Sequence, residues 1–425
     1  MSATEPAPQA KSINATAALL LLLAINLFNY IDRQVLAAVE PEIRKELFAG
    51  VDAQKAKESM GLLPFAFLIS YMVTAPLFGW LAGRWSRWLL VGIGVVLWSL
   101  ASGGSGVNWG IGVSAGFGAL LVTRCFVGVG EGAYGPIAPA MLADLYPIAK
   151  RGRVMAYFYM AIPVGGALGY ALGEVMMRQF GWRWAFYAVV PPGILLGMCC
   201  FFMREPPRGK AQGSVWSQYW ALLKIPSYVL NTLGMTAMTF AIGGLAYWMP
   251  AFLDERKVPD VGPFGPRTFF GAITALSGLM ATLAGGWCGD KLRDRFSGSY
   301  FLVSGVALML GFPMVLAFVY TPFPLAWVFI FLAVFCLFFN TGPTNTILAN
   351  VTHSSVRPSA FALNILIIHF CGDAISPYAM AKVARGFGQD MDFIFVSAVM
   401  LLGGVVWLLG MMHLQRDTER VESGK

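Results

Sequence analysis

The stretch Gly79-Trp80-Leu81-Ala82-Gly83-Arg84-Trp85-Ser86-Arg87 returns in altered form as Gly286-Trp287-Cys288-Gly289-Asp290-Lys291-Leu292-Arg293. Each copy is a short basic turn, and each follows the second long apolar run of its half of the chain. A turn that recurs at the same place in two halves indicates an internal repeat. The repeat unit consists of each turn together with the apolar runs on either side of it.

The apolar runs around the turns have the length of membrane-spanning helices. Of the 425 residues, 57% are hydrophobic and 12% are charged, and that charged share is about half of the share in soluble domains. A spanning helix needs about 20 apolar residues. Twelve runs qualify: 17–39, 60–81, 88–106, 112–135, 153–177, 182–203, 228–252, 268–289, 299–320, 324–349, 359–384 and 392–413. The sequence therefore predicts an all-α integral membrane protein with twelve transmembrane helices in two six-helix bundles, 17–203 and 228–413, as in transporters that rock two bundles around a central site.

The polar segments predict how the chain is oriented. Residues 1–16 lack a cleavage site after a short apolar core, so they are predicted to be a tail rather than a signal peptide. Lys and Arg are more numerous in the connections on the side of this tail, and two connections on the other side have none. The positive-inside rule then makes both tails, 1–16 and 414–425, cytoplasmic. Basic loops also explain the net charge of +8, so no nucleic-acid partner is predicted.

The largest inner connection, 204–227, separates the two bundles. It opens with Arg204-Glu205-Pro206-Pro207-Arg208-Gly209, which ends a helix. It continues with Trp216, Tyr219, Trp220 and Leu223, spaced i, i+3, i+4 and i+7. This spacing predicts a short helix that lies in the membrane interface. A solvated linker that only touches the membrane is the alternative.

The first predicted span contains Asn29-Tyr30-Ile31-Asp32-Arg33. Ionisable residues within a membrane are costly unless they face a cavity or partners, so Asp32 and Arg33 are candidates for a functional site. Asn26, Asn29, Tyr30 and Arg33 share one helical stripe at i, i+3, i+4 and i+7. Such a stripe indicates a lining of water or substrate, with packing against a polar helix as the alternative.

The fourth predicted span carries Arg124, Gly128 and Glu131 on one face. Its glycines allow a neighbouring helix to approach closely. We predict that Asp32, Arg33, Arg124 and Glu131 form a ladder of alternating charge, with Arg124 near the midplane and Glu131 in the inner half. A conformational change in the distance between Asp32 and Arg124 would bind and release a proton, which assigns these four residues to proton coupling. Purely structural salt bridges are the alternative.

Polar and aromatic residues of the C-terminal half complete the predicted substrate site. His369 and Asp373 lie one helical turn apart and can share a proton. An anionic head group held by Arg33 and Arg124 would leave an apolar tail against the aromatic C-terminal wall. The predicted substrate-binding residues are Asn29, Tyr30, Arg33, Arg124, Tyr247, Trp248, Phe338, Asn340, Asn345, His369 and Asp373.

The inner turns supply candidate gating residues, whose salt bridges would close that side. They are Gly83, Arg84, Arg87, Asp144, Arg151, Asp290, Lys291 and Arg293. No nucleophile–base set accompanies them, so the sequence predicts no enzyme. The six cysteines have no metal-ligand spacing, which predicts neither a metal site nor structural disulfides. No cofactor is expected, and the driving force would be a proton gradient.

At this point the chain resembles the major facilitator superfamily over nearly its whole length. The two basic turns resemble the loop motif of that family, and Arg124 to Gly132 resembles its Arg-x-x-x-Gly-x-Gly-Glu motif. A narrower resemblance is to the spinster-like branch, through Asn29 to Arg33, Arg204 to Gly209 and the run His369-Phe370-Cys371-Gly372-Asp373-Ala374-Ile375-Ser376-Pro377. The first of these three is shared with anion/cation symporters of the same superfamily.

The resemblance implies proton-linked transport of lysophospholipids or sphingoid phosphates. It also implies roles in coupling and substrate contact for the acid of the first span and for Arg124 and Glu131. One departure concerns Gly83, where the family motif usually has an acid, whereas the second copy keeps Asp290. In the family this acid helps to latch the cytoplasmic side, so a weak latch and an inward-facing resting state are expected here.

The sequence thus predicts a monomeric, multi-pass secondary transporter in the plasma or inner membrane of a bacterium. It would work by alternating access and move an amphipathic anionic lipid together with protons. The main alternative is a proton-coupled symporter of small organic anions, such as sugar acids, aromatic acids or dicarboxylic acids. A receptor or scaffold that moves nothing is a third class, which a flux measurement would distinguish.

Overall fold

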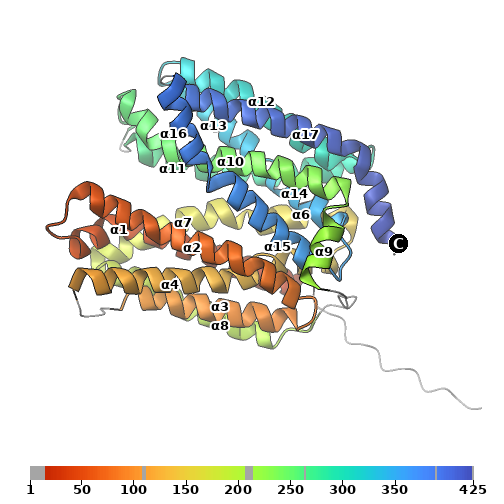
Figure 1. Cartoon of the computed structure of the whole chain (residues 1–425), viewed down its shortest axis with the longest axis horizontal. Coiled ribbons are helices and arrows are strands. Elements are labelled where there is room, and N and C mark those ends of the chain that lie inside the picture. Colours follow the sequence, from red (N-terminus) through yellow and green to blue (C-terminus); the bar gives the residue numbers. More distant parts are fainter. Residues whose placement is uncertain (1–14, 108–111, 206–213, 263–264, 388–389, 424–425) are drawn as a thin grey trace, which may run out of the picture.

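The computed structural model describes residues 15–107, 112–205, 214–262, 265–387 and 390–423. They form two bundles of long helices, which lie one above the other in Figure 1. The N-terminal bundle consists of α1 (Ala15–Leu47), α2 (Ala53–Leu81), α3 (Arg87–Ser105), α4 (Gly112–Tyr134), α5 (Ile137–Leu145), α6 (Ile148–Tyr159), α7 (Ala161–Phe180) and α8 (Trp182–Phe201). The C-terminal bundle consists of α10 (Pro226–Glu255), α11 (Pro266–Arg293), α12 (Ser299–Tyr320), α13 (Ala326–Phe338), α14 (Thr341–Asn350), α15 (Arg357–Ile368), η1 (His369–Asp373), α16 (Ser376–Phe387) and α17 (Met391–Glu422).

Eleven helical segments of the described residues are long and apolar enough to cross a membrane. The predicted fourth span, now α4, is not among them. It still packs along α2 and α3 as a long helix. Gly94 and Gly130 allow the contact with α3, since a Cβ on either would lie 2.6 Å from the carbonyl oxygen of the other. The predicted twelve-helix fold is therefore confirmed.

Four spans are interrupted near their middle, and they occupy corresponding places in the two halves. The fourth breaks at Gly135-Pro136 and the fifth at Met160; the tenth breaks at Phe339-Asn340. The eleventh contains η1, a π-helical turn in which the Ala374 amide donates to the His369 carbonyl at 3.1 Å. Interrupted helices in both repeats are typical of the region where transporters bind substrate.

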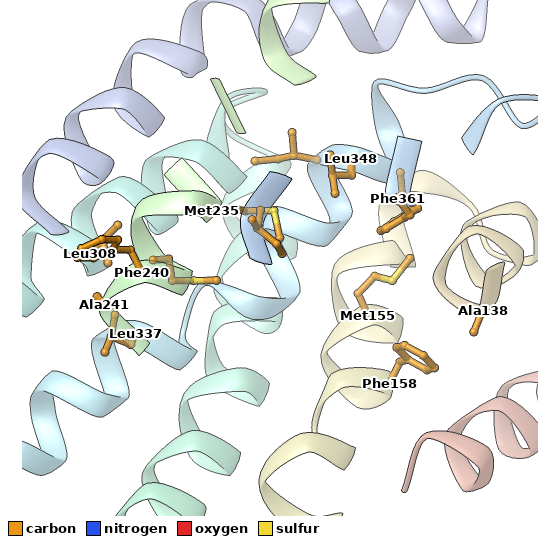
Figure 2. Close-up of a cluster of buried hydrophobic side chains, with 14 of the residues drawn as sticks. Ala138, Met155, Phe158, Met235, Phe240, Ala241, Leu308, Leu337, Leu348 and Phe361 are labelled. Atoms are coloured by element: carbon orange, nitrogen blue, oxygen red, sulfur yellow. The ribbon is translucent and has the colours of Figure 1, made fainter. Parts of the chain in front are cut away.

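The bundles meet at one end of the molecule and spread apart towards the other (Figure 1). One continuous cluster of buried apolar side chains crosses between them. In Figure 2 it includes Met155 and Phe158 from α6 together with Met235 and Phe361 from the C-terminal bundle. A second apolar cluster, around Val35, belongs to the N-terminal bundle. We call the end where the bundles meet the closed end.

Both ends of the described chain lie at the closed end. The Tyr146 hydroxyl donates to the Ala15 carbonyl at 3.1 Å, and Glu422 shares a small cavity with Arg293. Residues 1–14 of the predicted N-terminal tail lie outside the described residues, and so do residues 206–213 of the predicted linker. The predicted C-terminal tail, 414–425, is helical as far as Glu422, because α17 continues through it. Its last turns are held in part by Asp417, whose carboxylate accepts a hydrogen bond from the Ser227 amide at 3.0 Å.

The predicted linker helix is present as α9 (Val215–Leu222). It begins at Ser214, whose hydroxyl caps the helix by accepting a hydrogen bond from the Ser217 amide. Only part of the predicted face is exposed: Trp216 and Trp220 are 71% and 66% exposed, whereas Tyr219 is buried. The helix therefore presents its tryptophans outward while Tyr219 faces the protein.

Candidate functional site

The first helix carries its polar stripe into the centre of the N-terminal bundle. Asn26, Asn29 and Asp32 are buried. The Asn26 side-chain amide donates to the Phe158 carbonyl at 2.8 Å, which ties α1 to α6. Arg33, one residue further, keeps a quarter of its side chain exposed. The stripe therefore runs from the bundle core to an accessible cation.

Two glycines of α7 fix the position of this stripe. A Cβ on Gly165 would lie 2.7 Å from the Tyr30 Cβ, and a Cβ on Gly169 would lie 2.5 Å from the Ile31 carbonyl oxygen. Helices pack closely in membranes where small residues let their backbones approach. The segment that contains Asp32 and Arg33 is therefore positioned by backbone contact with α7.

Arg33 forms an ion pair with Glu131 of α4. Its Nε lies 2.7 Å from the Glu131 Oε2, and its Nη2 bonds to the same oxygen. The Glu131 side chain is buried, with 1% exposed. A buried carboxylate needs such a partner, because removing the cation would leave an uncompensated charge in a medium that solvates it poorly.

Aromatic rings surround the Arg33 guanidinium. Its carbon Cζ lies 5.0 Å from the ring centre of Tyr30, 4.8 Å from that of Phe67 and 5.4 Å from that of Tyr71. Ring faces attract a cation electrostatically. This arrangement holds the guanidinium between aromatic rings and Glu131, with a quarter of the Arg33 side chain exposed.

Asp32 and Arg124 approach the same face of α3. The Ser102 hydroxyl donates to the Asp32 Oδ1, and the Arg124 Nη2 donates to the Ser105 hydroxyl at 2.7 Å. The two serines are one helical turn apart, and the charges of Asp32 and Arg124 attract each other. The predicted cluster of four residues is thus brought together, but its direct ion pair joins Arg33 to Glu131 rather than Asp32 to Arg124.

Parts of this cluster lack hydrogen-bond partners among the described residues. They are the Oδ2 of Asp32, the Nε of Arg124 and the Oε1 of Glu131, all buried. Arg124 is 2% exposed, so in this conformation it lies behind the cluster and does not reach the space between the bundles.

The depth predicted for Glu131 is wrong. The apolar pattern ends the fourth predicted span at residue 135, which places Glu131 in the inner half. The span instead continues through α5 to Leu145. Asp144, near the end of this span, lies at the closed end. Glu131 precedes Asp144 by 13 residues, so at 1.5 Å per residue it lies about 20 Å further from the closed end. Glu131 therefore lies level with Arg33, near the middle of the bundle.

The C-terminal bundle faces this cluster with His369. Its Nδ1 lies 3.0 Å from the Asp373 Oδ2 and 3.1 Å from the Oδ1, as the spacing predicted. The His369 ring also contacts Tyr71, with ring centres 5.7 Å apart. Since Tyr71 also borders Arg33, one aromatic side chain joins the cation of one bundle to the histidine of the other.

A second contact between the bundles involves Asn345. The Tyr159 hydroxyl donates to its Oδ1 at 2.9 Å. Phe338 lies beside Gly278 and Pro163, where α7, α11 and α13 meet. Both predicted residues thus lie at the bundle interface.

Three other predicted substrate residues are placed differently. Asn340 is fully buried and donates to the Cys336 carbonyl at 2.8 Å, so it stabilises the break between α13 and α14. The Trp248 indole donates to the Pro377 carbonyl at 3.1 Å, which ties α10 to α16. Tyr247 is 63% exposed and packs on Trp248. We therefore do not group Asn340, Trp248 or Tyr247 with Arg33.

Asp144 is the centre of the closed end. Its carboxylate pairs with Arg87 of α3 and with Arg357 of α15, and all three side chains are buried. The Nε of Arg87 also lies 2.7 Å from the Glu205 Oε1. Asp144 of α5 links the bundles here, apart from the turn that contains Gly83, and the weak latch expected at Gly83 stays a prediction.

The second loop motif closes the other side of the same end. The Asp290 Oδ2 accepts a hydrogen bond from the Arg153 amide at 2.9 Å, and its Oδ1 accepts one from the Tyr300 hydroxyl at 2.8 Å. Arg151 donates to the Asn350 Oδ1 at 2.8 Å. These contacts join α6 to α11 and α14.

The remaining gating candidates lie in the turns themselves. The Arg84 guanidinium lies 4.1 Å from the ring centre of Trp80, and the Lys291 Nζ lies 4.5 Å from that of Trp287. Arg293 borders a cavity of about 230 Å³. Gly83 is buried in its turn.

The sequence did not predict several residues of the central charged cluster and of the closed end. At the cluster they are Phe67, Tyr71, Ser102, Ser105 and Tyr159; at the closed end they are Glu205 and Arg357. Arg357 could have been found, because it is a charged residue directly before Pro358 at the start of a span. The serines carry no such signal, since small polar residues are common in membrane helices.

The chain matches known membrane proteins over most of its length. The family model "Major Facilitator Superfamily" matches residues 22–377. This chain belongs to the major facilitator superfamily. Spinster homolog 3 of Danio rerio is 31% identical, with 98% of this chain and 89% of the relative covered. Spinster homolog 1 of Homo sapiens is 33% identical, with 94% and 81% covered. This member of the superfamily therefore falls in the spinster-like branch, whose members are transporters rather than enzymes.

Solved structures of the superfamily share the fold. The proton:xylose symporter XylE, bound to 6-bromo-6-deoxy-D-glucose, superposes with a TM-score of 0.76 at 15% identity over 95% of this chain and 98% of its own. A bacterial homolog of the human lysosomal transporter Spinster, in an inward-facing and unoccupied conformation, gives a TM-score of 0.59 at 20% identity over 96% and 98%. The facilitator described here is thus a multi-pass secondary transporter of small molecules.

Proposed function

We propose that this facilitator is a proton-coupled transporter of an amphipathic anionic lipid, of the lysophospholipid or sphingoid-phosphate type. The observation that carries the proposal is the partly exposed Arg33, paired with buried Glu131 and enclosed by aromatic rings between the two bundles. Protonation of Glu131 would remove its charge and free the guanidinium for an anionic head group. Proton binding and substrate binding then favour each other.

The surroundings of Arg33 favour a lipid over a small polar anion. A small anion with several charges needs several converging bases, and the other buried base of the cluster, Arg124, is turned towards α3. The walls near Arg33 are aromatic, and Phe338 supplies a further aromatic ring between the bundles at the junction of α7, α11 and α13. Each CH₂ buried against such walls contributes about 0.8 kcal/mol.

The proposal includes an orientation. The basic loops and both described ends of the chain lie at the closed end, which the positive-inside rule assigns to the cytoplasm. The conformation described here is then the outward-facing one of an alternating-access cycle. Rocking of the bundles would break the contacts of Asp144 and expose Arg33 to the cytoplasm.

Flux into proteoliposomes with an imposed pH gradient tests the proposal. Lysophosphatidic acids of increasing acyl length are the substrates, and short dicarboxylates and sugar acids are the competitors. We expect uptake that requires the gradient and an affinity that rises with chain length. Arg33→Ala should abolish substrate binding, while the control Arg178→Ala, at a surface position 72% exposed, should retain it.

The dependence on chain length is tested at Phe338. Phe338→Ala should flatten it, because the variant removes apolar wall at the bundle interface. Phe126→Ala, at a position 50% exposed on α4, is the matched control. Competition by dicarboxylates together with no effect of chain length would replace the lipid by a small organic anion.

A further inference from the structure

A groove separate from the central site lies at the closed end, under α9. It has a volume of about 580 Å³, within the range of pockets that hold small ligands. Its walls come from α9, from the connection between α14 and α15, and from the last turns of α17. Figure 1 shows α9 beside α15 at this end of the molecule.

The walls of the groove are mainly apolar and its charges are mainly positive. Leu222, Val351, Val356 and Val421 are among the lining residues. The cationic side chains are those of Lys224 and Arg420, both exposed, and His353 adds a titratable ring. A bound molecule would therefore meet apolar surface and two cations.

One acid, Asp417, also lines the groove, but it is already engaged. It is buried, and its Oδ2 accepts a hydrogen bond from the Ser227 amide at 3.0 Å, in the first turn of α10. The positive end of that helix stabilises the carboxylate. The free charge at the groove is therefore positive.

The outer side of α9 indicates what surrounds the groove. Trp216, Trp220 and Leu223 are 71%, 66% and 43% exposed on this helix. Tryptophan concentrates at the level of lipid head groups, and a short helix with an exposed face of tryptophan and leucine is typical of the membrane interface. The groove thus opens at the height where lipid head groups are found.

The inner side of α9 ties the groove to both bundles. The Tyr219 hydroxyl donates to the Pro76 carbonyl of α2 at 2.9 Å, and burial raises the pKa of this tyrosine, which keeps it protonated as the donor. The Ser359 hydroxyl of α15 donates to the Gln218 Oε1 at 2.8 Å. The helix is therefore held in place, and the groove beneath it is a built feature.

We propose that this groove binds an anionic phospholipid of the surrounding bilayer, with the phosphate between Lys224 and Arg420 and an acyl chain along the apolar wall. A free phosphate would use the cations but not the wall. A zwitterionic lipid would use the wall but would gain less from the cations. Basic residues beside a membrane surface select anionic lipids in this way.

Native mass spectrometry of the full, delipidated chain tests the site. The probes are phosphatidylglycerol and phosphatidylcholine of matched acyl chains, with inorganic phosphate as competitor. We expect tighter binding of phosphatidylglycerol, and a loss of its affinity by about tenfold in Lys224→Ala/Arg420→Ala. The matched control is Lys150→Ala/Arg295→Ala, which removes two exposed cations at the same end away from the groove.

Two further variants distinguish binding in the groove from binding at the central site. Ala221→Trp fills the groove while leaving both cations, and it should reduce binding as well; monodisperse elution checks that each variant is folded. Arg33→Ala should leave phosphatidylglycerol binding unchanged, because Arg33 belongs to the central site. Equal binding of the two lipids, unchanged binding in both groove variants, displacement by inorganic phosphate, or loss of binding in Arg33→Ala would each overturn the proposal.

Discussion

At the scale of single residues, the two buried carboxylates Glu131 and Asp144 both pair with arginines, but they have different roles. Glu131 faces a cation that keeps a quarter of its side chain accessible, whereas Asp144 holds two arginines that are almost completely buried. The first arrangement can exchange its partner for a ligand. The second can only be broken by moving the elements that carry it.

Glu131→Gln should separate proton coupling from substrate binding. The amide cannot ionise, so Arg33 would be permanently free for an anion. We expect accumulation driven by a pH gradient to be lost, while exchange of substrate at equal pH on both sides continues. Proteoliposome flux measures both, with Glu174→Gln, at an exposed surface pair, as the control. Retained gradient-driven accumulation would show that the coupling proton binds elsewhere.

Asp144→Asn should destabilise the closed end. Removing one partner of a buried ion pair costs about 3–5 kcal/mol, because the remaining charges lose their compensation. We expect a lower temperature of thermal unfolding and greater labelling of cysteines introduced at this end. Asp254→Asn, whose pair with Arg267 is exposed, should cost less than about 1 kcal/mol. Equal stability of the two variants would contradict the role given to Asp144.

The sequence revealed charged residues of the central cluster, because charges are rare in apolar runs. It did not reveal their pairing. Pairing depends on the depth of Glu131, and that depth changed once the span was found to continue through α5. Tyr71 and Phe67 were hidden for another reason: aromatic residues are ordinary in a membrane helix, and only the packing of α2 turns these two towards Arg33.

At the scale of elements, the contact between α1 and α7 determines where the charged stripe lies. Gly169→Ala should lower the temperature of thermal unfolding and weaken transport, since a Cβ there would lie 2.5 Å from the Ile31 carbonyl oxygen. Gly166→Ala on the same helix is the matched control, because its nearest neighbour would be 3.9 Å away. Because alanine has a higher helix propensity than glycine, the stability of Gly166→Ala should be unchanged or raised. A similar effect of both substitutions would exclude backbone contact as the cause.

Most spans were predictable to within a few residues, because the thickness of the bilayer sets their apolar length. The fourth was not, because α5 extends it to Leu145. The helices that run on into water were not: α1 continues to Leu47 and α17 to Glu422. Beyond the membrane, hydropathy carries no information about helix length. The break at Asn340 was hidden because an asparagine in a span equally suggests a ligand contact.

At the scale of the whole molecule, the two bundles must separate at the closed end if transport follows alternating access. Ala156 of α6 and Gly342 of α14 face each other there, and a Cβ on Gly342 would lie 3.4 Å from that of Ala156. This separation is close to the Cβ distance across a disulfide. The pair therefore offers a covalent test of the motion.

In a background without the six native cysteines, Ala156→Cys/Gly342→Cys should lose transport on oxidation and regain it on reduction. Each single-cysteine variant should transport under both conditions. Proteoliposome flux and gel mobility report activity and cross-linking together. Full transport by completely cross-linked protein would show that this end stays closed during the cycle.

The conformation was the part that sequence could not supply. The missing acid at Gly83 suggested that the bundles separate at the end of the molecule that carries the two basic turns, yet Asp144 and Arg357 link them there. Conformations of a transporter differ by only a few kcal/mol. That difference is a sum over both bundles, so one position in one turn does not decide it.

The π-helical turn at His369–Asp373 gives the eleventh span one residue more than regular helix would need. The wider turn absorbs that extra residue, so α15 and α16 keep nearly the relative facing of one regular helix. Deleting Cys371 should therefore return the span to regular periodicity and leave the residues beyond it facing nearly as they do now, whereas deleting a residue of the regular helix α15 would turn everything beyond it by about 100° around the helix axis. Thiol labelling at a cysteine in place of Tyr378, now 72% exposed, should therefore persist in the Cys371 deletion, and a loss of access would show that the turn does not absorb the residue. If the turn shifts along the span during the cycle, only the residues that it passes rotate around the helix axis, while the rest of α15 and α16 keeps its facing.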